Sequence, residues 1–378
     1  MFLTILIPCL NEEETVGKVI QKAQRAIESS GFEGEVLIVD NGSTDSSIAK
    51  SLSLGARVIE VSEIGYGSAL RAGIATSQGQ ITIMCDADDS YDIENVSSFI
   101  RQILGGSDLV IGNRFKGGIG RGAMPWLHKY VGNPILSWLG RLFFKVGIGD
   151  FHCGIRAFKT EAIRSLNLTS SGMEFASEMV VKASLHGLII TEVPTVLSVD
   201  GRSRAPHLKT WSDGWRHLVF LLAASPRWLF LYPGLLLTFI GLLGFVFTSV
   251  GPINVSQFQL DLNSFIIFIG LILVGIQVIL FGILARIFST NFGILPVTTS
   301  VTGFSKIFTL ERGVALGGIL LLTSIATAFG LLMRWDGNSI AGIDRDSALR
   351  ISGIVVLTSG VGIQTLFASF FASMLQVK

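Results

Sequence analysis

Three carboxylates directly follow a short apolar run in the N-terminal half of the chain. Residues 81–84 are apolar or β-branched, and Asp86, Asp88 and Asp89 come just after them. Such a run predicts a buried strand, and side chains at its carboxyl end project into the crevice where open α/β sheets bind ligands. Two carboxylates separated by one residue suit a hard cation, Mg²⁺ or Mn²⁺, that also holds substrate phosphates. A solvated acidic turn has the same local sequence, so the neighbouring segments must decide between the two interpretations.

Alternating segments around this run predict the elements that would position it. Residues 3–7 and 35–40 are expected to be strands, and between them apolar residues recur at helical spacing from Val16 to Ile27. Asn11 and Glu14 precede that helix with the spacing of an N-cap and its third-position acid. Further strands are expected at residues 57–61, 109–112 and 189–193. Strand, helix and strand in this order predict an α/β domain with a mostly parallel sheet.

Three other features are each open to two interpretations. Residues 65–70 form a glycine-flanked loop that either brings backbone N–H groups to a phosphate or is a plain tight turn. Residues 117–122 contain four glycines and form either a gate for an acceptor phosphate or a flexible connection. Glu178 lies one turn from Glu174 on an expected helix and either lines the acceptor side or has a capping or surface role.

The composition excludes some classes of partner. The 378 residues carry a formal net charge of +1, so nothing predicts binding to nucleic acid or another polyanion. Cys9, Cys85 and Cys153 are odd in number and far apart, which predicts neither a disulfide framework nor a zinc site. A reduced, cytoplasmic catalytic domain is the simplest expectation. Residues 1–10 lack the basic flank and the length of a signal peptide and are interpreted as part of the first strand.

Long apolar stretches dominate the second half of the chain. Residues 229–250, 264–287, 314–333 and 351–375 are each long enough to cross a hydrocarbon core, which needs about 20 helical residues. The first connection, 251–263, has no Lys or Arg, whereas basic residues occur in the second connection and at the end of the chain, namely Arg286, Lys306, Arg312 and Lys378. The positive-inside rule therefore predicts a multi-pass cell-membrane protein whose catalytic domain and both termini are cytoplasmic.

The polarity of these stretches predicts an anchor. Within them only Gln277 and Gln364 are strongly polar, and no charged side chain lies in mid-membrane. Transport pathways usually need such charges, so the bundle is expected to anchor the chain and can also serve as an interface in a homo-oligomer.

An apolar stripe precedes the first long stretch. It has helical spacing, has Asp213 and Arg216 on the opposite side, and consists of Trp211, Trp215, Leu218, Val219 and Leu222. This pattern predicts a helix in the membrane interface with Trp at the headgroup level. The expected domains are therefore a cytoplasmic catalytic domain (1–208), an interfacial helix (209–228) and an all-α transmembrane domain of about four helices (229–378).

Several short motifs along residues 1–205 occur in the order of a known family. They are Ile7-Pro8 with Asn11-Glu12, Ile38-Val39-Asp40-Asn41-Gly42-Ser43-Thr44-Asp45, Asp86-Ala87-Asp88, Gly112-Asn113-Arg114-Phe115 and Asp150-Phe151-His152-Cys153-Gly154-Ile155-Arg156-Ala157-Phe158. This ordered set resembles the family 2 glycosyltransferases, and its last member resembles the polyprenyl-phosphate sugar synthases of the dolichyl-phosphate mannose synthase type. One such motif is weak alone, and the ordered set is strong.

The resemblance implies a Rossmann-like GT-A domain that binds a nucleotide-diphosphate sugar. In this resemblance Pro8, Leu10, Glu12 and Asp40 line the pocket for the base and ribose, and Asp86 and Asp88 hold the metal, Mg²⁺ or Mn²⁺, on the diphosphate. Leu10 stands where the family commonly has an aromatic residue, and Ser90 stands where it often has Gln. These two departures affect the choice of base and sugar and leave the metal site intact.

Basic residues complete the implied site. Arg202 and Arg204 resemble the family's basic segment that closes over the diphosphate, and guanidinium groups suit that role because they stay charged and fork onto phosphate oxygens. Contact with anionic headgroups next to the membrane is the alternative role for this segment. Arg114 would offset phosphate charge, and Asp150 would orient the acceptor or act as a base, although a structural carboxylate would look the same.

The function implied by these features is inverting transfer of a sugar from a nucleotide-diphosphate sugar to a polyprenyl phosphate at the cytoplasmic face. A processive polysaccharide synthase is an alternative, but Ala224 stands where the Gln-x-x-Arg-Trp motif of those enzymes begins. A non-catalytic transporter or scaffold for lipid-linked sugars is another, and the intact acidic triplet argues against it.

Overall fold

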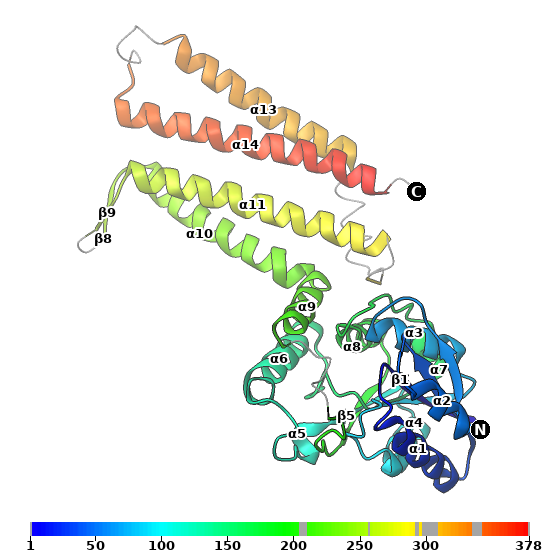
Figure 1. Cartoon of the computed structure of the whole chain (residues 1–378). Coiled ribbons are helices and arrows are strands. Elements are labelled where there is room, and N and C mark those ends of the chain that lie inside the picture. Colours follow the sequence, from blue (N-terminus) through cyan, green and yellow to red (C-terminus); the bar gives the residue numbers. More distant parts are fainter. Residues whose placement is uncertain are drawn as a thin grey trace. The chain divides into compact units, whose positions relative to one another are not determined.

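The computed structural model describes residues 2–203, 210–255, 258–291, 295–296, 309–334 and 342–376. The chain divides into two compact units, Met1–Ala224 and Ser225–Lys378 (Figure 1). The first unit contains the sheet, and the second contains the long apolar helices.

In the described part of unit 1, seven strands form one sheet in the order β3-β2-β1-β4-β6-β5-β7. The strands are β1 (Phe2–Cys9), β2 (Glu33–Asp40), β3 (Arg57–Glu60), β4 (Ile81–Met84), β5 (Leu109–Asn113), β6 (Arg156–Lys159) and β7 (Ile190–Pro194). All pairs that do not involve β6 are parallel, which confirms the predicted mostly parallel sheet. Strand β6 runs antiparallel between β4 and β5, with Arg156 opposite both Met84 and Ile111.

Helices cover the two faces of the sheet. They are α1 (Val16–Ser30), α2 (Ser47–Ser53), α3 (Tyr66–Thr76), η1 (Ile93–Asn95), α4 (Ser97–Leu104), α5 (Arg114–Gly117), η2 (His128–Gly132), α6 (Asn133–Phe144), α7 (Thr160–Arg164), α8 (Phe175–Leu185) and α9 (Thr210–Ala223). Consecutive β1 residues such as Ile5, Leu6 and Ile7 are all fully buried, because both faces of a parallel sheet are covered. This burial explains why the central strands have continuous apolar sequences.

The start of α1 differs from the expectation. Its N-cap is Thr15, and Asn11 lies four residues earlier with a φ of 55°. The Asn11 side chain accepts a hydrogen bond from Thr44 N at 2.7 Å, so it ties the β1 loop to the β2 loop. The prediction of Asn11 as the N-cap was therefore wrong, because the side chain found a non-local partner instead of the helix.

Helix α9 buries its polar face. Asp213, His217 and Leu221 are spaced four residues apart and lie against the rest of unit 1. Trp211 and Trp215 point away and are 81% and 65% exposed. Trp211, Trp215 and Val219 of the apolar stripe are exposed, and Asp213, on the side opposite the stripe, is buried.

The described residues of unit 2 form helices and one short antiparallel strand pair, β8 with β9. Its elements are η3 (Arg227–Leu231), α10 (Tyr232–Ser249), β8 (Ile253–Val255), β9 (Phe258–Leu260), α11 (Leu262–Asn291), α13 (Leu310–Leu332) and α14 (Arg345–Gln376). Among the described residues, four helices are long and apolar enough to cross a membrane: Arg227–Ser249, Leu262–Asn291, Leu310–Leu332 and Arg345–Gln376. Helix α11 packs between α10 and α14, and α13 packs on α14 (Figure 1).

Glycines allow two of these helix pairs to approach closely. A Cβ at Gly275 of α11 would overlap Thr238 of α10, and a Cβ at Gly317 of α13 would lie 2.8 Å from the carbonyl oxygen of Gly362 in α14. Small residues at such crossings let backbones approach, which is how helices pack in lipid.

Candidate active site

The carboxyl edge of the sheet collects most of the predicted site residues. Glu12 follows β1, Asp40 ends β2, Asp86 and Asp88 follow β4, and Arg114 follows β5. These four strands run in the same direction, since β4 and β5 are both antiparallel to β6, and their carboxyl ends therefore lie at one edge, as expected for a ligand site in an open α/β sheet. Asp150 reaches the same edge from the loop before the antiparallel β6, and it contacts Arg114.

Asp40 has an unused buried oxygen. Its Oδ2 accepts N–H groups from Gly42 at 2.9 Å and Ser43 at 3.0 Å, whereas its Oδ1 is buried without a hydrogen-bond partner among the described residues. Buried polar atoms are nearly always paired, so a free acceptor here suits a ligand donor. Pro8 and Leu10 lie half-buried at the end of the neighbouring strand β1.

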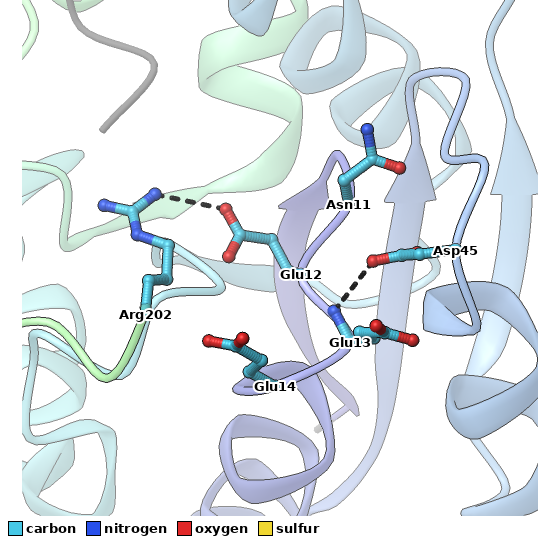
Figure 2. A pocket seen from close by; sticks show the side chains of 6 residues that line it. All are labelled: Asn11, Glu12, Glu13, Glu14, Asp45 and Arg202. Carbon is cyan, nitrogen blue, oxygen red and sulfur yellow. Dashed lines mark hydrogen bonds and ion pairs between the residues drawn. The ribbon is translucent and has the colours of Figure 1, made fainter. Parts of the chain in front are cut away.

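Arg202 sits within a group of carboxylates (Figure 2). Its Nη1 donates to Glu12 Oε1 at 3.1 Å, and its Nη2 lies 2.9 Å from both Asp88 Oδ2 and Asp200 Oδ2. Burial lowers the pKa of Arg202, but Asp200, Asp88 and Glu12 outweigh it and raise the pKa above the usual value. A pocket next to this guanidinium is lined by Asn11, Glu12, Glu13, Glu14, Asp45 and Arg202 (Figure 2).

Residues 198–203 are held over the same edge. Ser198 N donates to Ser90 O and Gly201 N to Asp88 O, both at 2.9 Å, and Ser203 N donates to Glu14 Oε2 at 2.7 Å. The segment that was predicted to close over the diphosphate therefore lies, as far as Ser203, next to the carboxylates that surround Arg202. Arg204, which was predicted to act with Arg202, lies outside the described residues.

Asp86 and Asp88 differ in their surroundings. Tyr66 OH donates to Asp86 Oδ1 at 2.9 Å, and burial together with the charge of Asp88 raises the pKa of Asp86 to about 6. Asp88 Oδ1 accepts Ser90 N at 3.1 Å, and its Oδ2 faces Arg202. Asp89 has a φ of 62° and turns away to pair with Lys22 at 2.5 Å, so the third carboxylate of the triplet is not part of this site.

The two aspartates fit a divalent cation. Within the described residues no group of three or more His, Cys, Asp or Glu side chains is arranged to hold a metal ion. Mg²⁺, however, is usually bound by one or two carboxylates together with substrate phosphates. The guanidinium of Arg202 already lies against Asp88, so a positive charge is accommodated there. Gly154 packs directly against Asp86, because a Cβ at residue 154 would overlap Asp86 Oδ2.

Arg114 and Asp150 form a buried, two-pronged ion pair. Arg114 Nε donates to Oδ2 at 2.7 Å, Arg114 Nη2 to Oδ1 at 2.8 Å and Arg114 N to Oδ2 at 3.1 Å. Asp150 is fully buried and Arg114 is 8% exposed. Burial lowers the pKa of Arg114, but Tyr91 and Asp150 outweigh it and hold the pKa well above the usual value, so the guanidinium stays charged. Both Asp150 oxygens are engaged in positioning Arg114.

Glu192 is a residue of the site that the sequence did not indicate. It lies in β7, and its carboxylate accepts N–H groups from Gly149, Asp150 and Asn113 and pairs with Lys116. Its local sequence signal is weak, namely one carboxylate inside an otherwise ordinary strand.

Two of the open alternatives are decided by contacts. Gly67 N and Ser68 N, at the start of α3, both donate to the carbonyl oxygen of Ser171, at 2.9 and 3.2 Å, so both N–H groups are already paired within the protein. Glu178 is buried, accepts Ser170 N at 2.8 Å and pairs with Lys182 at 2.8 Å, which is a structural role.

A buried polar cluster joins α9 to the loop that carries Asp150. Ser177 Oγ lies 2.8 Å from His217 Nδ1 and 3.3 Å from His152 Nε2, and the two imidazole rings meet edge to face at 4.4 Å between centroids. Burial and the charge of Arg156 lower the pKa of His217 to about 4, so the imidazole is neutral near pH 7. Arg156 itself is fully buried and donates to three backbone carbonyls, those of Cys153, Ala176 and Phe151.

A mostly parallel sheet with an acidic carboxyl edge, followed by apolar helices, defines a GT-A-like domain attached to a membrane region. Residues 4–166 match the model of glycosyl transferase family 2, and residues 283–376 match that of the glycosyltransferase family 2 C-terminal transmembrane region. The chain is 33% identical over 373 residues to the low-salt glycan biosynthesis hexosyltransferase Agl6 of Haloferax volcanii, covering 97% of this chain and 87% of the relative. The chain therefore belongs to the family 2 glycosyltransferases, and it is a membrane protein of that family.

Other similarities cover between 51% and 59% of the chain. The dolichyl-phosphate hexose transferase of Haloferax volcanii is 30% identical over 194 residues, which is 51% of this chain and 81% of the relative. Among solved structures, glucosyl-3-phosphoglycerate synthase from Mycobacterium tuberculosis, in complex with Mn²⁺, UDP and phosphoglyceric acid, has a TM-score of 0.46 at 22% identity and covers 59% of this chain and 78% of that one.

Proposed function

We propose that this protein transfers a hexose, with inversion, from a nucleotide-diphosphate sugar to a polyprenyl phosphate at the cytoplasmic face of the cell membrane. The observation that carries the proposal is that carboxylates and a buried guanidinium lie together at the carboxyl edge of the sheet. Asp86 and Asp88 supply an acidic half, and Arg114 supplies a buried permanent cation near enough to act on the pKa of Asp86. A reaction between two phosphate-bearing substrates needs both halves.

The donor would occupy the ends of β1, β2 and β4. Pro8, Leu10 and Glu12 would line the base and ribose, and the unpartnered Oδ1 of Asp40 would accept an N–H or O–H group of the nucleoside. Asp86 and Asp88 would hold Mg²⁺ or Mn²⁺, which when bound supplies positive charge to the departing diphosphate. Arg202 would turn from the carboxylates toward the same phosphates, together with Arg204.

The acceptor would lie beside Arg114. The second pKa of a phosphate monoester is about 6, so at neutral pH the acceptor is already an anionic nucleophile. It needs positioning more than deprotonation, which agrees with a fully buried Asp150 whose oxygens both bind Arg114. In this proposal Arg114 binds and orients the acceptor phosphate, and Asp150 fixes the direction of its guanidinium.

Exposed aromatic residues support a membrane location for unit 1. Trp211 and Trp215 of α9 and Trp138 of the neighbouring α6 are more than half exposed, as is Trp126 just before η2. Trp is enriched at the headgroup level of membranes. We propose that this side of unit 1 faces the cytoplasmic leaflet, where a polyprenyl phosphate presents its head group. The names of Agl6 and of the dolichyl-phosphate hexose transferase agree with a hexose donor and a lipid phosphate acceptor.

The test is sugar transfer by the purified full-length protein. Radiolabelled UDP- and GDP-sugars are offered with undecaprenyl or dolichyl phosphate, in Mg²⁺, in Mn²⁺ and in chelator, and label is counted in the chloroform phase. Wild-type protein is expected to give metal-dependent, lipid-soluble label with one donor, and Asp88→Ala to give none.

Absence of lipid-soluble label with every donor, despite nucleotide binding, would overturn the proposal. Label in a water-soluble polymer would indicate a polysaccharide synthase instead. Equal transfer in chelator and in Mg²⁺ would support the proposed lipid acceptor and would show that the reaction does not need a metal.

A further inference from the structure

Glu192 of β7 has an unusually complete set of donors for one carboxylate. Its Oε1 accepts Gly149 N at 2.6 Å, Asp150 N at 3.1 Å and Asn113 Nδ2 at 2.9 Å. Its Oε2 pairs with Lys116 Nζ at 2.9 Å. The Glu192 side chain is 6% exposed, whereas that of Lys116 is 61% exposed. Oε1 therefore accepts three of the four hydrogen bonds of Glu192, and the fourth contact, the ion pair of Oε2, is with an exposed lysine.

These donors come from the two segments that carry the Arg114–Asp150 pair. Asn113 directly precedes Arg114, and its Oδ1 accepts Lys116 N at 2.9 Å, which caps the short helix α5. The Asn113 amide group is therefore bound on both sides, by the helix start and by Glu192. Gly149 must be small here, because a Cβ would lie 2.8 Å from Asn113 Nδ2. One oxygen of Glu192 thus binds the backbone N–H of Asp150 and the side chain of Asn113, the residue before Arg114.

The donor half of the site has no such link to Glu192. Among the described residues, Asp40 accepts hydrogen bonds from Gly42 and Ser43 of the loop after β2, and Asp86 accepts one from Tyr66 at the start of α3. A change at Glu192 therefore displaces Arg114 and Asp150 relative to the donor pocket without altering that pocket. Displacement of a reacting group by about 1 Å can cost about a hundredfold in rate.

We infer that Glu192 is a positioning residue for sugar transfer, which acts by fixing the Arg114–Asp150 pair where the acceptor phosphate binds. The inference rests on the proposed function and deepens it, since it separates residues that serve the acceptor from those that serve the donor.

Three variants of the full-length protein test the inference. Glu192→Ala removes all four contacts. Glu192→Gln keeps the oxygen that accepts three N–H groups and loses only the ion pair to Lys116, which can turn to solvent. Glu35→Ala is the matched control, because Glu35 also accepts four hydrogen bonds, from Thr4, Gln78 and twice from Arg57, at the opposite end of the sheet.

The measurements are nucleotide binding by calorimetry, to count folded sites, and kcat with KM for donor and for polyprenyl phosphate per folded site. Glu192→Ala is expected to lower kcat divided by acceptor KM about a hundredfold while donor binding changes less than about twofold. Glu192→Gln is expected to stay within about threefold of wild type, and Glu35→Ala to keep wild-type kinetics per folded site even where its Tm falls.

The outcomes are distinct. Wild-type transfer rates per folded site in Glu192→Ala would overturn the inference and leave the proposed function standing. A loss in Glu192→Gln as large as in Glu192→Ala would also overturn it, because the positioning oxygen is then not what matters. If Glu192→Ala binds no nucleotide, Glu192→Asp replaces it, and a wild-type rate in that shortened side chain counts against the inference. A wild-type protein that transfers nothing to lipid removes the proposed function and this inference together.

Discussion

Variants of the buried ion pair between Arg114 and Asp150 can separate its effect on stability from its effect on sugar transfer. Replacing Asp150 by Ala removes the acceptor of three Arg114 N–H groups and leaves an 8% exposed guanidinium without its counter-charge. Loss of one partner of a buried pair costs about 3–5 kcal/mol. At about 2–4 °C per kcal/mol for a unit of this size, Asp150→Ala is expected to lower the apparent Tm by about 10 °C.

The double variant Arg114→Met with Asp150→Ala supplies the contrast. It removes both charges, and replacing a whole buried pair by apolar groups is often close to neutral. Most of the lost Tm is therefore expected to return. Transfer activity is expected to stay at least about a hundredfold below wild type, because the cation proposed to bind the acceptor phosphate is gone.

The assay is differential scanning fluorimetry in detergent, with lipid-linked transfer measured on the same preparations. A single variant that melts with wild type would mean that Arg114 does not depend on Asp150. A double variant that melts no higher than the single one would mean that an unpaired charge is not the cause. An active double variant would remove Arg114 from the acceptor site.

Three further results are expected. Gly154→Ala places a Cβ on Asp86 Oδ2 and is expected to lower kcat about a hundredfold with nucleotide binding largely kept, and wild-type kcat would show that Asp86 can move. Arg202→Gln removes a charged donor worth about 1.5–3 kcal/mol and is expected to lower kcat/KM for the nucleotide sugar about 10- to 100-fold, whereas an unchanged value would place Arg202 on headgroups instead. The pKa of His217 is lowered from 6.5 to about 4 in the folded unit. Between these pH values the unfolded chain binds a proton that the folded unit does not. The free energy of unfolding therefore falls as the pH falls, by about 3 kcal/mol in total. His217→Phe is expected to flatten that fall in a plot of Tm against pH, and an equally steep fall would exclude His217 as its source.

The strands of the sheet could be predicted where consecutive residues are all apolar. Residues such as Ile5, Leu37 and Ile83 are buried on both faces of a parallel sheet, and this produces continuous apolar runs. Strand β6 escaped prediction, because its four residues begin with Arg156 and end with Lys159 and show neither a run nor an alternation. The burial of Arg156 is stabilised by three backbone carbonyls that accept its hydrogen bonds, those of Phe151 and Cys153 just before it and that of Ala176.

The site was predictable as a set of residue types and not as a set of contacts. The positions of Asp40, Asp86, Asp88 and Arg114 follow from strand ends. The pairing of Arg114 with Asp150 spans 36 residues, and the contact of Arg202 with Glu12 spans 190, so local sequence gives no sign of either. Asn11, whose local sequence suggested a helix cap, binds Thr44 instead, and Asp89, the third carboxylate of the triplet, pairs with Lys22.

The reversed direction of β6 has a consequence for how the length of this chain can vary. Met84 and Ile111 both face Arg156, and continuing these antiparallel registers by two residues brings Gly154 opposite Asp86 and Asn113. The length of the segment from Asp150 to Arg156 therefore fixes two contacts of the site at once, that of Gly154 with Asp86 and that of Asp150 with Arg114. An inserted or deleted residue there would shift Gly154 away from Asp86 and Asp150 away from Arg114 at once. Surface loops at the other end of the sheet, such as Gly105–Gly106, carry no such constraint, so natural or engineered insertions belong there.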